Sequence, residues 1–206
     1  SDPPYYTACP NPWLNDFIGE WEKEKENIKG RKKDFHVDEP YASDVSEGKN
    51  NPIYNAHSYH TKVPHPAIMR YILHYTQPGD IVFDGFAGTG MTGVATQNCN
   101  HPDAETKYLI ENEFKNLGLH FPKWGIRKAI LSDLSPVASF ISSNYNTPVE
   151  LEDFAEYTKK ILGDFEHEYG WMYNTKHTNN QQAKINYTVW SDVFGCPHCM
   201  CEFNFY

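Results

Sequence analysis

The sequence predicts an α/β protein with a Rossmann-like, doubly wound fold, of which this chain carries an incomplete part. Residues 81 to 84 are a short, β-branched apolar segment typical of a buried strand. That segment runs into a glycine-rich stretch and then into residues 91 to 98, which suit a helix. A second strand-like segment, 128 to 132, is followed by a helix start signal at Ser135 and Pro136. Strand, glycine loop and helix in this order open a doubly wound fold.

The part of the chain before the first strand predicts two helices and much irregular structure. Residues 1 to 16 are rich in proline and aromatic residues and are expected to form an ordered loop. Apolar side chains recur at helical spacing over residues 17 to 33, whereas residues 34 to 63 are polar and indicate irregular structure. Pro64 suits the first turn of a second helix. The apolar positions of that helix are Ala67, Ile68, Tyr71, Ile72 and Tyr75.

The part after the glycine-rich stretch alternates helices and strands, again judged by apolar periodicity and turn residues. The expected elements are a helix at 104 to 117, a strand at 128 to 132, helices at 136 to about 145 and at 151 to 169, a polar loop at 174 to 184, and a candidate strand at 185 to 190.

Composition bounds the class of protein. The chain has 206 residues, 39% hydrophobic and 15% aromatic, which favours a globular fold over disorder. No apolar stretch approaches the roughly 20 residues of a membrane span. The five cysteines are an odd number with three crowded near one end, which is a poor disulfide framework. A reducing, cytoplasmic location is therefore expected.

The net charge of −9 is unusual for a protein that binds nucleic acid, since contacts with phosphate groups need Lys and Arg. It predicts that a main DNA-binding surface lies outside this chain if DNA is the substrate. The one dense basic run, residues 29 to 33, follows an acidic stretch, residues 20 to 26. A solvated helical face is the favoured interpretation of this run, and a DNA-binding patch is the alternative.

The candidate ligand site is the segment Asp84-Gly85-Phe86-Ala87-Gly88-Thr89-Gly90. Glycines after a strand allow a sharp turn and close approach of a ligand, and the next helix offers free N–H groups. We expect a side chain at Gly88 or Gly90 to fill space that the ligand needs. Gly88, Gly90 and Gly93 also match the G-x-G-x-x-G dinucleotide fingerprint, and a tight turn without ligand is a further alternative. Against a dinucleotide, Asp84 would repel a pyrophosphate but would suit an ammonium group.

The segment from His60 to Val94 resembles amino-group DNA methyltransferases, which modify adenine N6 or cytosine N4. The matching features are His60-Thr61-Lys62-Val63-Pro64, a helix, the turn Pro78-Gly79-Asp80, and the strand with its glycine loop. The resemblance implies a methyltransferase fold that binds S-adenosylmethionine. The implied cofactor-binding residues are Thr61, Lys62, Asp84, Gly85, Phe86, Ala87, Gly88, Thr89, Gly90, Asp133, Leu134 and Ser135.

Each of these residues has an implied role. Asp84 would face the methionine amino group, and Thr61 and Lys62 would close over the methionine carboxylate. The loop from Gly85 to Gly90 would line methionine and ribose. Asp133 would accept hydrogen bonds from the ribose hydroxyls, with Leu134 or Ser135 beside the adenine. For Asp133, a simple helix N-terminal residue stabilised by the helix dipole is the alternative.

Four further segments, residues 5–12, 44–48, 144–148 and 187–190, extend the resemblance. With them, the sequence is similar to the amino-terminal part of large bacterial DNA methylases of restriction or phage-defence type. The expected parts are a proline- and aromatic-rich lid with a helix at 1 to 59, the S-adenosylmethionine-binding domain at 60 to 173, and the start of a truncated zinc ribbon at 185 to 206. DNA is then the expected partner of the whole enzyme, and this chain alone is expected to be inactive on DNA. A dinucleotide-dependent oxidoreductase and a non-catalytic module with the same fold are the alternatives.

Asp2, Pro3, Pro4 and Tyr5 spell the catalytic motif of amino methyltransferases. In that motif the Asp and the first Pro carbonyl accept hydrogen bonds from the exocyclic amine of a flipped base, and the aromatic ring stacks on the base. Only about 55 residues separate Asp2 from His60, too few for the strands and crossovers expected between the two regions. A proline-rich lid is therefore favoured, with the functional motif expected beyond residue 206.

Cys196 and Cys199 have the spacing of one knuckle of a zinc ribbon. His198 and Cys201 are too close to complete an ordinary four-ligand site, so the second knuckle is expected beyond this chain. Zinc would be bound in the full-length protein, or shared between chains. Two free cysteines and a redox pair are the alternatives.

Overall fold

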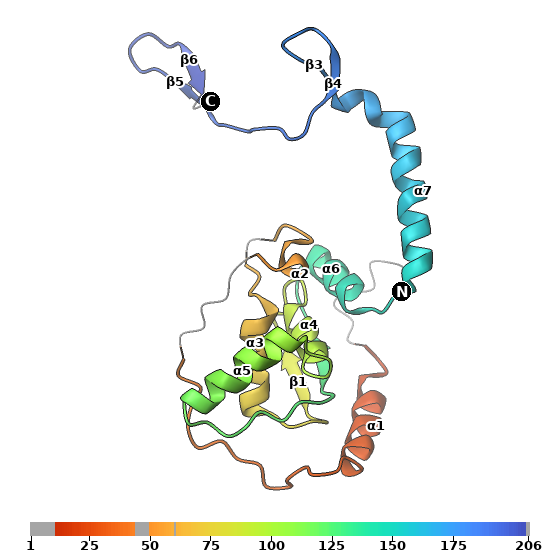
Figure 1. Ribbon diagram of the computed structural model, residues 1–206, viewed down its shortest axis with the longest axis vertical. Helices are drawn as coiled ribbons and strands as arrows, with labels where there is room; N and C mark the ends of the chain where they lie inside the picture. Colours follow the sequence, from red (N-terminus) through yellow and green to blue (C-terminus); the bar gives the residue numbers. More distant parts are fainter. Residues whose placement is uncertain (1–10, 44–49, 60, 205–206) are drawn as a thin grey trace. The chain divides into compact units, whose positions relative to one another are not determined.

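The computed structural model describes residues 11–43, 50–59 and 61–204, and it is a mixed α/β structure (Figure 1). The chain divides into two compact units, with the boundary between Thr147 and Pro148. This boundary falls inside the range 60 to 173 expected for one domain, and the expected domain limits remain a prediction. Each unit is described by itself below.

The first unit is built around one parallel strand pair. Strand β1 (Ile81–Asp84) pairs with β2 (Lys128–Leu131), in a register that joins Ile81 to Lys128 and Asp84 to Leu131. Helices α4 (Met91–Asn98) and α5 (Ala104–Asn116) lie between the two strands in the chain. Parallel neighbours require such a crossover. The expected strand–helix–strand order is confirmed, and it fits a Rossmann-like fold.

Helix α3 (His65–Tyr75) supplies much of the core of the first unit. Met69 and Leu73 on α3 pack with Ala95 and Cys99 of α4 and with α5, where Phe114 is fully buried. Figure 1 shows these three helices close to β1. Removing a buried Phe or Leu side chain from such a core costs about 2–5 kcal/mol. The core therefore holds α3, α4 and α5 together, and Val82 of β1 packs against it.

The first helix is shorter than the sequence suggested. Helix α1 spans Leu14–Glu26, not residues 17 to 33. Asn27 caps it, and Gly30 has a positive φ of 78°, which no continuing helix adopts. The guanidinium of Arg31 donates hydrogen bonds to the Pro78 carbonyl (2.8 Å) and to Asp80 (2.6 Å). The basic run is thus not a helical face, because Arg31 anchors it on the turn before β1.

Two further helices complete the first unit. The short α2 (Pro52–Asn55) interrupts the region that was expected to be irregular. Helix α6 (Pro136–Asn146) begins as expected, because the Ser135 hydroxyl accepts a hydrogen bond from the Ala138 N–H. Helix α6 packs on α4, which places its last turn against the start of α4. In this contact the Asn146 side chain of α6 donates a hydrogen bond to the carbonyl of Gly90, the last residue of the glycine loop.

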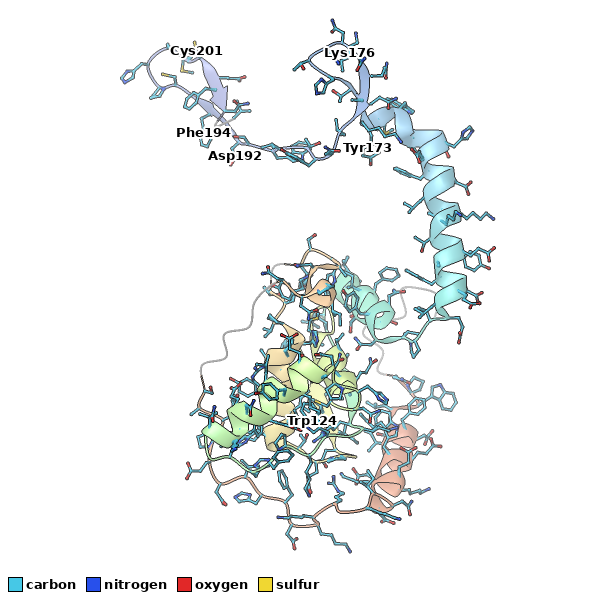
Figure 2. All side chains as sticks on the ribbon, viewed as in Figure 1. Trp124, Tyr173, Lys176, Asp192, Phe194 and Cys201 are labelled. Carbon is cyan, nitrogen blue, oxygen red and sulfur yellow. The ribbon has the colours of Figure 1, made fainter. Side chains whose placement is uncertain are left out.

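The second unit begins with α7 (Leu151–Tyr169), a helix at the expected position, which continues into the short 3₁₀ helix η1 (Gly170–Tyr173). No residue of α7 is buried. Two antiparallel hairpins follow: β3 (Asn174–Lys176) with β4 (Gln182–Lys184), and β5 (Val193–Gly195) with β6 (Glu202–Asn204). Figure 2 marks Lys176 on the first hairpin and Cys201 on the second.

Two sequence expectations in this unit were wrong. Residues 174 to 184 are a hairpin and not a loop, because Asn180 adopts a positive φ of 63° and donates from its N–H to the His177 carbonyl (2.8 Å). Turn chemistry decided this segment, and apolar periodicity gave no sign of it. Residues 185 to 190 form no strand. Within the described ranges these residues have no strand neighbour to pair with, so their β-branched and aromatic composition is not enough.

Among the described residues, no helix combines the length and the apolar character that crossing a bilayer requires.

Candidate functional site

The glycine loop lies at the carboxyl ends of β1 and β2, where ligands bind in open α/β sheets. The Ser132 N–H donates to the Asp84 carbonyl (2.9 Å), and the Ala87 N–H donates to the Ser132 carbonyl (2.9 Å). These two bonds extend the strand pairing beyond β2 into the loop. They bring the residues that follow both strands together, although more than 40 residues separate them in the chain.

The carboxylate of Asp84 is held by two donors. Its Oδ1 accepts from the Phe86 N–H at 3.1 Å, and its Oδ2 accepts from the Thr92 hydroxyl at 2.6 Å. An ionised carboxylate has about four lone-pair positions, so each oxygen can accept a further bond. Asp84 is therefore oriented by the protein and still has acceptor capacity for a ligand.

The carboxylate of Asp133 connects the loop to α6. Its Oδ2 accepts from the Gly88 N–H at 2.8 Å, and its Oδ1 accepts from the Ser135 N–H at 2.8 Å. The second bond is the N-terminal arrangement that the dipole alternative described. The first bond is a long-range one that fixes the middle of the glycine loop. Asp133 thus has a structural role at this site, whatever else it binds.

A pocket of about 120 Å³ opens beside the loop. Several expected residues line it together: Thr61, Lys62, Asp84, Phe86, Ala87, Gly88 and Thr89. Its remaining lining residues are Tyr59, Val63, Ile68, Met91 and Thr92, which sequence reasoning did not assign to the site. A larger hollow of about 650 Å³ lies along α7 in the second unit, but its wall is a single helix face from Phe154 to Glu166 and carries none of the expected residues.

The pocket wall is closed at Thr89 and open at Gly88. Thr89 is 2% exposed, and its hydroxyl is buried without a hydrogen-bond partner among the described residues. A ligand in the pocket could bond to this hydroxyl only after the wall moved, because the hydroxyl is not accessible from the pocket. A Cβ at Gly88 would meet only Tyr59, at 3.8 Å, so the space in front of Gly88 is open.

The glycine at position 90 serves a different purpose from the one expected. A Cβ on Gly90 would lie 2.3 Å from Ser142 Oγ and 2.6 Å from Asn146 Nδ2, both on α6. A Cβ on Gly93 would lie 2.3 Å from Asn146 Oδ1. These glycines allow α4 and α6 to approach each other closely. The expectation that a side chain at Gly90 would fill ligand space is therefore corrected: it would fill packing space.

Lys62 is tied down within the segment that covers the pocket. Its ammonium group donates to the carbonyls of Tyr54 and His57 and lies 4.4 Å from the centre of the Tyr54 ring. The His57 ring contacts Tyr145 of α6 edge-on, with centroids 4.9 Å apart. Burial lowers the pKa of His57, and the nearby Lys62 charge lowers it further. Lys62 thus ties its own segment to Tyr54 and His57, and Thr61 and Lys62 both line the pocket beside the glycine loop.

The other expected cofactor residues lie around the pocket and do not line it. Gly85 and Gly90 flank the loop, and Ser135 caps α6. Leu134 is 94% exposed and Phe86 is 88% exposed, so two large apolar side chains face solvent at this edge of the sheet. Exposed apolar side chains next to a pocket are typical of a surface that contacts a ligand or another segment.

Thr92 is a pocket residue that sequence reasoning missed and that bonds directly to Asp84. Its only sequence signal is a hydroxyl at the second position of the helix after the loop. That signal equally fits an ordinary residue of a first helical turn. Only the fold shows that the hydroxyl reaches back to Asp84.

The two remaining candidate sites lie elsewhere. Asp2, Pro3, Pro4 and Tyr5 are outside the described residues. Cys196 and Cys199 lie in the turn between β5 and β6, where the Cys196 N–H donates to the Cys201 carbonyl (2.9 Å). In the described part of the chain, no group of three or more His, Cys, Asp or Glu side chains is placed to hold a metal ion.

Comparison with known proteins identifies the family. The sequence profile of a family described as DNA methylase, of the N6 and N4 amino-group class, matches residues 2–117. No curated protein matches the chain. No solved structure matches it either. The matched range covers more than half of the 206 residues and includes α3, β1, the glycine loop and α4. The chain therefore belongs to the amino-group DNA methylase family.

Proposed function

We propose that this chain binds S-adenosylmethionine at the glycine loop and provides the cofactor site of a DNA methyltransferase. The observation that carries the proposal is the pocket at the carboxyl end of β1, where the oriented Asp84 carboxylate lies beside the open space in front of Gly88. Members of the DNA methylase family generally use this cofactor, which supports the same assignment.

The ligand would be held by groups from both strand ends. Asp84 would accept hydrogen bonds from the methionine ammonium, and Thr89 would form part of the pocket wall beside it. The open space in front of Gly88 would admit the chain of the ligand between methionine and ribose. Gly85, Phe86, Ala87 and Gly90 would border it, with Thr61 and Lys62 on the carboxylate side.

The adenosine end would lie toward β2. Asp133 keeps one lone pair on each oxygen after its bonds to Gly88 and Ser135, so it can accept from ribose hydroxyls. The exposed side chain of Leu134 would cover the adenine, next to Ser135. The pocket of about 120 Å³ is well below the roughly 300–1,000 Å³ of ordinary ligand pockets, so it would enclose only the methionine end.

A dinucleotide fits this site less well. The Asp84 carboxylate lies at the loop where a pyrophosphate would bind, and like charges in one site repel each other. The bound methionine would instead present an ammonium group. S-adenosylmethionine would supply an electrophilic methyl group to an exocyclic amine of adenine or cytosine, and membership of the family supports this proposal. The contribution of this chain is to position the cofactor.

Calorimetric titration of the chain with S-adenosylhomocysteine and, separately, with NADH tests the proposal. We expect saturable binding of S-adenosylhomocysteine and no binding of NADH. The reason is that the Asp84 carboxylate in the pocket wall would attract an ammonium group and repel a pyrophosphate. Binding of NADH alone would establish the oxidoreductase alternative. Binding of neither ligand would leave the non-catalytic module.

We also propose that Cys196 and Cys199 are two ligands of a zinc site. Both lie in the turn of the β5–β6 hairpin, where the Met200 N–H donates to the Cys196 carbonyl (2.9 Å) and Met200 has a positive φ of 60°. Hydrogen bonds from Cys201 and Cys196 lower the pKa of the Cys199 thiol, which favours the thiolate that zinc requires. Two more ligands would complete a tetrahedral site.

Alkylation of the full-length protein with and without excess zinc, read out for each cysteine by mass spectrometry, tests this second proposal. Zinc is expected to slow alkylation of Cys196 and Cys199. Cys99 is the internal control, because it is buried in the core and belongs to no candidate metal site. Equal alkylation rates of Cys196 and Cys199 with and without zinc would refute the proposal.

A further inference from the structure

Thr92 makes the shorter of the two hydrogen bonds to Asp84. It is the second residue of α4, its side chain lines the pocket, and its hydroxyl donates to Asp84 Oδ2 at 2.6 Å. The other donor, the Phe86 N–H, is farther away at 3.1 Å and belongs to the exposed part of the loop. Thr92 therefore gives Asp84 a contact with a regular helix.

The Thr92 side chain is well suited to fix a neighbour. A threonine in a helix is restricted to two favoured χ1 rotamers. The bond to Asp84 holds Thr92 in one arrangement. An Asp side chain alone rotates broadly about its terminal torsion. A donor on each carboxylate oxygen fixes the plane of the group, and the two outer lone pairs then point in fixed directions. Those lone pairs are the ones left for a ligand.

One turn further along α4, Thr96 shows the ordinary use of a helical threonine. Its hydroxyl donates to the Thr92 carbonyl at 2.7 Å, and it does not line the pocket. Thr92 departs from this pattern, because its hydroxyl bonds to a strand residue eight positions earlier. Helix formation alone does not explain that bond.

We infer that Thr92 is a positioning residue, which orients Asp84 for an ammonium group and so selects ligands that carry an amino acid. This inference rests on the proposed binding of S-adenosylmethionine at the same pocket. Thr92 needs no contact with the ligand for this role, because it acts through the Asp84 carboxylate. Loss of the Thr92 hydroxyl should therefore lower the affinity only for those ligands that Asp84 recognises.

The test compares Thr92→Val with the natural chain, using calorimetry with S-adenosylhomocysteine and with 5′-methylthioadenosine. The second ligand keeps the adenosine and the thioether but lacks the amino acid. Valine preserves the shape of threonine and removes the donor. We expect affinity for S-adenosylhomocysteine to fall about 5- to 30-fold, which lies within the range for coupled residues in one network. Affinity for 5′-methylthioadenosine should stay within about twofold.

Two matched variants separate positioning from general damage. Thr92→Ser keeps the hydroxyl and should restore most of the affinity for S-adenosylhomocysteine. Thr96→Val removes a similar hydroxyl from the same helix and should not change the ratio of the two affinities. In the Asp84→Asn background, Thr92→Val should add no further loss, because the group that it positions has lost its charge.

The outcomes distinguish this inference from the proposed function. If the natural chain binds neither ligand, the proposed function fails. If the natural chain binds S-adenosylhomocysteine and Thr92→Val binds it equally well, only the role of Thr92 is overturned. An equal loss of affinity for both ligands in Thr92→Val would also overturn the role of Thr92. An additive loss of affinity when Thr92→Val is combined with Asp84→Asn would do the same.

Discussion

The Asp84→Asn variant is expected to bind S-adenosylhomocysteine about 10- to 100-fold more weakly than the natural chain. The substitution removes the negative charge at the pocket wall and keeps the shape of the side chain. Hydrogen bonds to charged groups contribute about 1.5–3 kcal/mol, and each 1.4 kcal/mol is about a factor of ten in affinity. The measurement is calorimetric titration, as for the natural chain.

Asparagine is the appropriate replacement because the loop depends on Asp84 as well. The amide oxygen can still accept from the Phe86 N–H, and the Thr92 hydroxyl can turn to accept from the amide nitrogen. The midpoint of thermal unfolding should therefore change little. Binding of 5′-methylthioadenosine should also be preserved, since that ligand has no ammonium group.

Two results would contradict this account of Asp84. An equal loss of affinity for both ligands would show that Asp84 acts by holding the loop and not by recognising the amino acid. NADH binding by the natural chain that the substitution leaves unchanged would show that the carboxylate repels no pyrophosphate, and would favour the dinucleotide alternative.

The parts of the site that sequence predicts are those that local chemistry determines. The strand at 81–84, the glycine loop and α4 follow from β-branched residues, glycines and helical spacing that are neighbours in the chain. Ser135 was recognised as an N-cap for the same reason. Asp84 could be picked out because it ends a strand directly before glycines.

The parts that sequence does not predict depend on contacts between distant segments. The bond from the Gly88 N–H to Asp133 joins residues 45 positions apart, and no local pattern indicates it. The early end of α1 follows from the docking of Arg31 on Asp80, 49 positions away. The Thr92 side chain could only be assigned once the position of Asp84 relative to α4 was known.

The two strand-end carboxylates divide the work of the site. Asp133 fixes the middle of the loop by accepting from the Gly88 N–H, whereas Asp84 is itself fixed by Thr92 at the start of α4. The loop is therefore held from the β2 side and from the α4 side. A loop held at its start and at its middle is preorganised, which reduces the entropy lost when a ligand binds.

The packing behind the loop leads to the second large effect. Gly90→Ala is expected to destabilise the first unit by about 2–5 kcal/mol. Gly90 has φ of 83° and ψ of 25°, a left-handed conformation that costs a residue with a Cβ about 1–2 kcal/mol. The new Cβ would also lie 2.3 Å from Ser142 Oγ and 2.6 Å from Asn146 Nδ2. Overpacking of this kind adds about 1–3 kcal/mol.

Gly88→Ala is the matched comparison, because Gly88 also has a positive φ, of 53°, but no close neighbour. Its added Cβ would meet only Tyr59 at 3.8 Å, an ordinary contact, so only the backbone cost of about 1–2 kcal/mol applies. Urea denaturation followed by circular dichroism should rank Gly90→Ala as clearly less stable than Gly88→Ala.

The effect of Gly88→Ala should appear in ligand binding. This variant is expected to remain folded but to lose affinity for S-adenosylhomocysteine, because its methyl group occupies the pocket. If Gly90→Ala were as stable as the natural chain and lost only ligand binding, then the glycine at position 90 would serve the ligand, and the close approach of α4 and α6 would not be what requires it.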